Sequence, residues 1–211
     1  MERGDRVHRR GGVLRLEERG RLMNLTASIL QAGTGCTAAA AVKWLPCIQA
    51  ACDKYQIATR LRVAAFIAQI GHESGHLVYV REIWGPTAQQ RGYDGRADLG
   101  NTKPQAISIA KAHGSTPGRW WAGHGLIQVT GFDNHRLMGV ALGLDLLNHP
   151  EQLEVPANAA MSAGEYWFSR GLNALADASD FLTITRRING GTNGLADRQA
   201  LYAAALKAIP A

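Results

Sequence analysis

The sequence predicts a mostly α-helical protein. Alanine- and leucine-rich stretches recur along the chain, whereas alternating β-branched residues, the signal of strands, are sparse. The hydrophobic fraction is 46% and the charged fraction 19%, which is typical of globular chains. A chain of 211 residues can bury enough surface to fold without staples, and its three cysteines lack the spacing of a zinc site or a disulfide framework.

Six stretches carry the helical pattern, and glycine-rich segments separate several of them. The helices are expected over residues 38–55, 61–71, 102–112, 156–169, 178–188 and 196–208. The long loops predicted between them are 85–101, 114–125 and 189–194. Long loops in a compact helical domain usually carry function, so these three are candidates for the site.

Residues 1–22 differ from the rest of the chain. They hold seven arginines against four acidic residues and show little apolar periodicity, so we expect a flexible, Arg-rich tail. Met23 opens a more ordinary sequence, and we interpret it as the true start, with 1–22 as upstream sequence. Residues 23–211 are predicted to form a single domain, because no repeat or linker divides them.

Charge and hydropathy exclude two classes of partner. The net charge is +6 at pH 7, and the tail carries half of it, so the body is too weakly basic to predict nucleic-acid binding. A mildly cationic body does suit an anionic polymer substrate. Polar residues interrupt the apolar segment 25–42, which makes a poor signal sequence, and no stretch approaches the roughly 18 apolar residues of a membrane span.

Glu73, in RVAAFIAQIGHESGH, is the first candidate catalytic residue. Apolar residues recur at helical spacing from Val63 to Ile70, and Glu73 falls at the edge of that stripe, near Phe66. It also stands at the expected end of the helix, just before Gly75, where the helix dipole is negative. Partial burial and a negative helix end both favour the protonated form of a carboxyl group, as a general acid requires.

Glu82 is the second candidate. It follows Glu73 by nine residues, with a glycine between them, so the chain can turn and bring the two acids to opposite walls of one cleft. Glycoside hydrolysis uses such a pair: one carboxyl group protonates the leaving oxygen, and the other activates water or attacks the sugar.

The same segment matches a zinc-protease motif, H-E-x-x-H, from His72 to His76. Ser74 and Gly75 weaken the helix that would have to hold both histidines on one face. The extended motif also lacks its third histidine, because Glu82 stands at that position. A metalloprotease therefore stays a lesser alternative, beside an inactive glycan-binding module and a lytic transglycosylase, which would need no second carboxylate.

Several segments together resemble the family-19 glycoside hydrolases, a group of chitinases and phage-type endolysins. AAFIAQIGHESGHLVYVREIW resembles its catalytic segment, GHGLIQVTGFDNH its R-G-x-I-Q segment, and ITRRINGGTNGLADR its I-N-G-G…D-R segment. YDGRADLGNT matches the phage and bacterial branch. The resemblance covers roughly residues 24–208, in the family's order.

The resemblance implies a two-lobed, lysozyme-like catalytic domain with a central cleft and an inverting mechanism. Glu73 falls on the general acid, Glu82 on the general base, and Thr130 on the hydroxyl residue that holds the attacking water. No metal and no organic cofactor is implied. Arg198 falls on a cleft arginine that tunes the acid, and further substrate contacts are expected at His72, Tyr93, Gln128, Asn134 and Asn189.

Four residues depart from the family's pattern. His76 replaces a glycine, His124 an arginine and His135 a tyrosine, while Asn193 stands where plant members have a glutamate. None of these changes removes a candidate catalytic carboxylate. They bear on substrate choice and cleft geometry.

The expected substrate is peptidoglycan, cleaved between N-acetylmuramic acid and N-acetylglucosamine; the alternative is chitin and its oligomers. The sequence shows neither an export signal nor a carbohydrate-binding module, which is typical of a prophage endolysin. We therefore expect a monomeric enzyme made in the cytoplasm of a Gram-negative host. It would reach the wall from the periplasm with the help of a holin-type partner.

Overall fold

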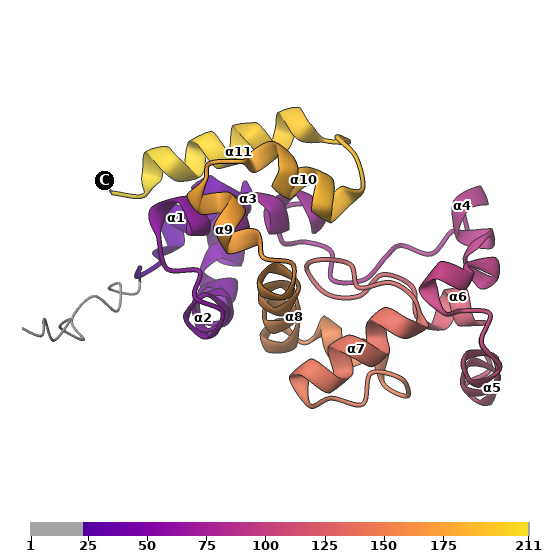
Figure 1. The fold of residues 1–211 in the computed structure, drawn as a ribbon. Helices are drawn as coiled ribbons and strands as arrows, with labels where there is room; N and C mark the ends of the chain where they lie inside the picture. The colour runs from indigo at the N-terminus through magenta and orange to yellow at the C-terminus, as the bar shows by residue number, and fades with distance from the viewer. Residues whose placement is uncertain (1–22, 211) are drawn as a thin grey trace, which may run out of the picture.

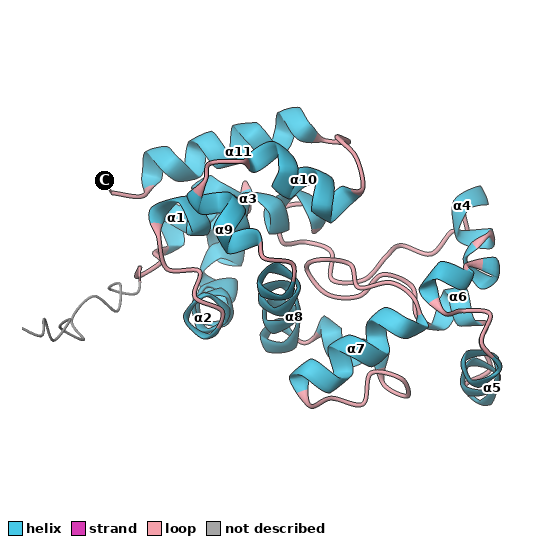
Figure 2. Ribbon diagram, viewed as in Figure 1, coloured by secondary structure: helices cyan, strands magenta, loops and turns pink. Residues whose placement is uncertain are grey.

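The computed structural model describes residues 23–210 as a helical fold (Figures 1 and 2). The predicted tail, residues 1–22, lies outside the described residues. Within that range, extended pairing is confined to two isolated bridges, from Arg81 to His124 and from His124 to Val129. None of the described helices is long and apolar enough to cross a membrane.

Eleven α-helices and three short 3-10 helices make up the described part of the chain. The 3-10 helices are η2 Tyr93–Gly95, η3 Ala97–Leu99 and η4 Pro150–Glu154. The α-helices are α1 Ala27–Thr34, α2 Ala38–Lys54, α3 Arg60–Glu73, α4 Ala88–Arg91, α5 Pro104–Ala112, α6 Pro117–Trp120, α7 Phe132–Leu142, α8 Pro156–Ser169, α9 Leu172–Asp177, α10 Phe181–Asn189 and α11 Leu195–Ala208.

The six predicted helices are confirmed as α2, α3, α5, α8, α10 and α11. Helix α10 starts three residues later than expected because the Asp180 side chain caps it, accepting a hydrogen bond from the Thr183 amide. The sequence prediction missed α1, α7 and α9, and it was wrong to leave 85–101 and 114–125 without helices, since α4, α6 and two 3-10 turns lie there.

The larger lobe is built around α3. Every residue of α3 from Val63 to Gly71 is buried, because α1, α9 and α11 cover it (Figure 1). Gly71 allows the close approach of α1: a Cβ atom at this position would lie 2.6 Å from the Cα of Thr34. Trp167 of α8 packs edge-on against Phe66, with ring centroids 5.5 Å apart. The stripe that carries Glu73 is thus the core of this lobe.

The smaller lobe contains α4, α5, α6 and the turns between them, and it has its own apolar cluster of Ala106, Ala110, Trp121 and Phe132. Figure 1 shows this group to one side of the larger lobe, with α7 between them. Two separate apolar clusters confirm the two-lobed architecture.

Two buried histidines join the segment 122–130 to α7. The Nδ1 atom of His135 bonds the carbonyl oxygen of Gly131 at 2.9 Å, so this nitrogen must carry the proton. The Nε2 atom of neutral His135 is then the acceptor for Nδ1–H of His124, 3.2 Å away. Burial lowers the pKa of His124 to about 4 and that of His135 to about 3, and nearby Arg81 adds to the shift at His124.

Acid should therefore destabilise the fold through this pair. Between about pH 6.5 and pH 4 the unfolded chain takes up protons on both histidines while the folded chain does not, so stability falls as the pH falls. Each histidine contributes a slope of about 1.4 kcal/mol per pH unit there. We expect His135→Gln, whose amide can donate to Gly131 and accept from His124, to lower the slope measured by urea unfolding. Equal slopes in the two proteins would contradict this prediction.

Candidate active site

Glu73 is the last residue of α3, as the sequence predicted, and its side chain is 18% exposed. The helix stops because the next residues turn back: the Ser74 hydroxyl donates to the carbonyl of Ile70 and accepts from the amide of Leu77. Backbone φ is positive from Gly75 through Leu77, which no helix continues. Glu73 is thereby held at an end of the buried helix, facing out of the lobe.

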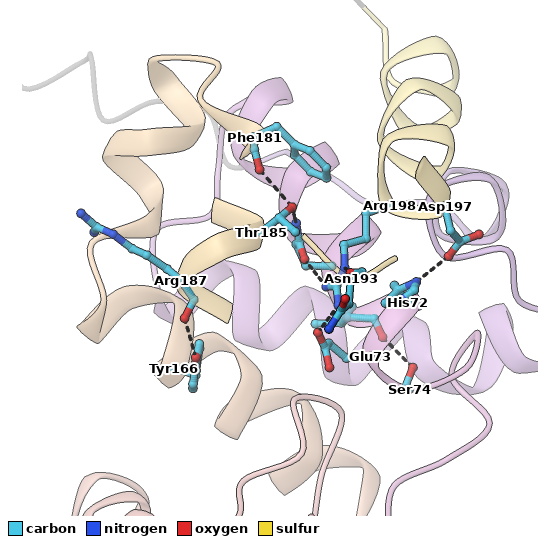
Figure 3. A network of polar contacts seen from close by, with 12 residues as sticks. His72, Glu73, Ser74, Tyr166, Phe181, Thr185, Arg187, Asn193, Asp197 and Arg198 are labelled. Atoms are coloured by element: carbon cyan, nitrogen blue, oxygen red, sulfur yellow. Dashed lines mark hydrogen bonds and ion pairs between the residues drawn. The ribbon is translucent and has the colours of Figure 1, made fainter. Parts of the chain in front are cut away.

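Arg198 of α11 forms an ion pair with Glu73, with Nη2 2.5 Å from Oε1 (Figure 3). Only 1% of the Arg198 side chain is exposed, so its charge depends on protein partners. Its Nη1 atom donates to Oε1 of Gln69, and its Nε atom donates to the carbonyl of Asn193. The Gln69 amide in turn donates to the hydroxyl of Thr185. One buried polar chain thus runs from α10 through α3 and α11 to Glu73.

His72, the residue before Glu73, contacts the start of α11. Its Nδ1 atom lies 2.6 Å from Oδ2 of Asp197, the residue before Arg198. Its ring packs so closely on Gly194 that a Cβ atom there would lie 2.3 Å from Nε2. The contact with sugar expected at His72 stays a prediction, and what the structure shows is a contact between α3 and the start of α11.

The H-E-x-x-H motif does not form a metal-binding helix face. Helix α3 ends at Glu73, so His76 lies beyond the helix, and its Nδ1 atom bonds the carbonyl of Thr34. His72 is bonded to Asp197 instead. The described residues contain no group of three side chains that could hold a metal ion. The geometry therefore disfavours the metalloprotease alternative.

Glu82 belongs to the smaller lobe, where three groups donate to its carboxylate. Gln90 Nε2 and the Tyr93 hydroxyl donate to Oε1, at 2.9 and 3.1 Å, and the amide of Gly123 donates to Oε2 at 3.0 Å. The amide of Glu82 donates to the Gly123 carbonyl at 2.7 Å, which fixes the backbone as well. Burial is the main cause of the raised pKa of Tyr93, and the Glu82 charge adds to it.

Gln90 was missed by the sequence analysis. Its side chain is 5% exposed, and both ends are bonded: Nε2 donates to Glu82 and to the carbonyl of Ile83, while Oε1 accepts from the amides of Gly85 and Thr87. Thr87 and Gln90 also form the capping box of α4. The spacing T-x-x-Q signals such a box, but nothing in it points to Glu82. Tyr93, expected to contact sugar, donates to Glu82 in this structure.

Three of the predicted substrate-site residues meet at one cavity. Gln128, Thr130 and Asn134 line a cavity of about 470 Å³ together with residues of η3, α7, α8 and α10, so both lobes contribute to it. The Thr130 hydroxyl donates to the Gln128 carbonyl at 2.9 Å, and Asn134 donates to the Thr130 carbonyl at 2.8 Å. Asn189, by contrast, is the exposed last residue of α10, next to Ile188 in the cavity wall.

This combination defines a class of protein. A helical fold of two lobes, a carboxylate held by each lobe, and a cavity lined from both lobes are features expected of lysozyme-like glycoside hydrolases. The sequence family described as chitinase class I, glycoside hydrolase family 19, matches residues 34–197. The chain therefore belongs to glycoside hydrolase family 19, a family of inverting, chitinase-type enzymes.

Individual relatives agree with the assignment to glycoside hydrolase family 19. The chain is 31% identical to a family-19 domain-containing protein of Haemophilus influenzae, over 74% of this chain and 84% of that protein. It is 30% identical to an endochitinase of Arabidopsis thaliana over 61% of this chain, but the match spans only 39% of that protein.

Two solved structures share the fold. A bacterial family-19 chitinase has a TM-score of 0.65 at 21% identity, over 88% of this chain and 95% of its own. Chitinase C from Streptomyces griseus has a TM-score of 0.62 at 20% identity, over 87% of this chain and 75% of its own. At such identities the likeness establishes the fold.

Arg198→Gln should destabilise the larger lobe. The change removes the cation that pairs Glu73 and leaves Gln69 short of a donor inside the core, a loss of about 3 kcal/mol or more. Chemical unfolding of the variant and the wild type measures this loss of stability. The matched control is Arg62→Gln, which breaks a more exposed ion pair with Asp177 and should cost much less. Similar losses in the two variants would show that burial of the Arg198 pair is not decisive.

Proposed function

We propose that this enzyme is an endolysin that hydrolyses the β-1,4 bonds of peptidoglycan, with Glu73 as general acid, Glu82 as general base and Thr130 as the residue that holds the water. The observation that carries the assignment is the contrast between the two carboxyl groups. Glu73 is paired with one buried cation, whereas Glu82 accepts three hydrogen bonds from uncharged donors. Two carboxyl groups in unlike surroundings suit two unlike proton-transfer roles.

The contacts of Glu73 leave one oxygen for chemistry. Arg198 bonds Oε1, and no group of the described residues bonds Oε2. In the proposed reaction, Oε2 carries the proton and delivers it to the glycosidic oxygen as the bond from that oxygen to C1 breaks. The carboxylate that remains is already paired with Arg198, so the charge that develops on Glu73 is stabilised where it forms.

Glu82 supports the other half of the reaction. A carboxylate with both oxygens fixed by donors is an oriented acceptor, and it takes the proton of a water as that water forms a bond to C1. Thr130 lines the cavity and presents a hydroxyl that is oriented by its bond to the carbonyl of Gln128. Gln128 and Asn134, which line the same cavity, supply amides for the hydroxyl and N-acetyl groups of the sugar.

Peptidoglycan is the proposed substrate because it is anionic and the predicted domain, residues 23–211, is mildly cationic, with 16 Lys and Arg against 13 Asp and Glu. We further propose that the enzyme acts as a monomer on the wall of a Gram-negative host, from the periplasm, after a holin-type partner has opened the inner membrane. Chitin is the competing substrate. It is favoured by the similarity to an Arabidopsis endochitinase and to the chitinase folds.

Turbidity loss of chloroform-treated Gram-negative cells, run beside a chitin assay, tests the substrate and the acid together. The wild-type enzyme should be more active on the cells than on chitin when both assays use the same enzyme concentration. Glu73→Gln should lose about 10²–10⁴-fold in rate, since it removes the proton donor at nearly constant volume. Circular dichroism checks that this variant is folded. Chitin hydrolysis without lysis would overturn the peptidoglycan proposal, and lysis by Glu73→Gln near the wild-type rate would overturn the acid assignment.

The anomer of the first product tests the role of Glu82. If Glu82 activates water, the new reducing end is α, because water attacks C1 opposite the departing β-linked sugar. Proton NMR of a fresh digest detects it before mutarotation, and Glu82→Gln should slow turnover without trapping a covalent intermediate. A β product or a 1,6-anhydro product would contradict this role, and the anhydro product would support a transglycosylase.

A further inference from the structure

The cavity beside Thr130 extends beyond the groups that the proposed reaction uses. Its lining includes residues of α7 and α8, among them the apolar Leu137, Met138 and Ala141 and the cationic Arg170. Leu137 is 56% exposed, so its side chain is accessible to a ligand in the cavity. The cavity therefore offers apolar side chains and a cation besides the sugar-binding amides.

Arg170 is held in place in this cavity. Its guanidinium carbon lies over the ring of Tyr166, 3.5 Å from the centroid, and the Tyr166 hydroxyl is itself fixed by donating to the carbonyl of Arg187. No carboxylate of the described residues forms an ion pair with Arg170. The guanidinium is thus oriented by an aromatic base and keeps its hydrogen-bonding edge for a ligand.

This cation lies near the proposed acid. Burial raises the pKa of Tyr166; Arg170 opposes the rise, and the nearby Glu73 carboxylate adds to it. Tyr166 is therefore close to both groups. Glu165 also lines the cavity, but it lies near Tyr55, where burial and the Glu165 charge raise the pKa of the phenol to about 12.

Chitin and peptidoglycan differ at the place where such a cation would matter. N-acetylglucosamine carries no ionised group, so a chitin chain gives Arg170 no charged partner. The muramic acid of peptidoglycan carries a lactyl group, whose methyl is apolar and whose carboxyl is either free or linked to a stem peptide with further carboxylates. A cavity lined by both apolar side chains and a guanidinium matches that substituent.

We propose that this cavity is the subsite for the muramoyl substituent of peptidoglycan, with Arg170 binding a carboxylate and Leu137 covering the lactyl methyl. The inference rests on the proposed function and deepens it, because it assigns a specificity residue. Arg170 acts on substrate choice, and the general acid and base remain Glu73 and Glu82.

Arg170→Gln tests the inference with three substrates: intact sacculi, the same glycan strands after amidase removal of the peptides, and N-acetylglucosamine hexamer. The kcat/KM should fall about five- to tenfold on the form of peptidoglycan that carries the bound carboxylate, as for one lost charge-assisted contact, while that on the hexamer changes less than about twofold. The matched control is Arg136→Gln, which removes the same charge from the other face of α7, and it should affect no substrate selectively.

The stripped strands identify the carboxylate. In intact sacculi the lactyl carboxyl is an amide, so a loss there assigns Arg170 to a carboxylate of the stem peptide. A loss confined to the stripped strands assigns it to the lactyl carboxylate, which is free only on them. Equal losses on sacculi and hexamer, or no loss on either form of peptidoglycan, would overturn the inference alone. Wild type that fails to cleave any peptidoglycan would overturn the proposed function and this subsite together.

Discussion

A buried guanidinium must be paired on every side, and this constraint organises the larger lobe. Arg198 is almost fully enclosed, so its charge is balanced by Glu73 and its remaining donors are taken by Gln69 and the Asn193 carbonyl. These contacts join α11 to α3, and Thr185 extends them to α10. The three helices that surround Glu73 therefore cannot be repacked without leaving a charge or an amide unsatisfied. The position of the proposed acid and the stability of this lobe depend on the same contacts.

In the smaller lobe Glu82 is held by uncharged donors from three places: Gln90 in α4, Tyr93 in η2 and the amide of Gly123. The segment from Gly123 to Thr130 contributes the backbone part of this positioning. Gly123 bonds both the backbone and the carboxylate of Glu82, and a bridge pairs His124 with Arg81, the residue before Glu82. Thr130 stands at the other end of the same segment. The same segment therefore positions both the proposed base and the proposed water-holding hydroxyl. The buried His124–His135 pair connects this segment to α7.

The sequence predicted helices where alanine-rich stretches are long, and failed where caps or polar motifs hide the pattern. Helix α8 lies over the expected residues 156–169. Helix α7 was missed because its start, after Gly131, has no side-chain cap and its first turn carries the polar residues Asp133 and Asn134. Glu73 was placed correctly at a helix end. The partners of Glu82 could not be predicted from the sequence. Gly123 is 41 residues away from Glu82 along the chain, and the sequence around Gln90 indicates only a capping box.

Asn193 shows how one departure from the family's pattern changes the electrostatics of the site. The family resemblance places Asn193 where plant members have a glutamate, and a glutamate here would add a second negative charge near Arg198. In this chain Asn193 offers Arg198 only its backbone carbonyl. Within the described residues, Glu73 is therefore the sole ion-pair partner of Arg198. When Glu73 is protonated, the buried guanidinium has no full counter-charge; when Glu73 gives up its proton, the pair is restored. In the proposed mechanism this imbalance favours proton donation at the moment the glycosidic bond breaks, because the interaction is stronger after the transfer than before it.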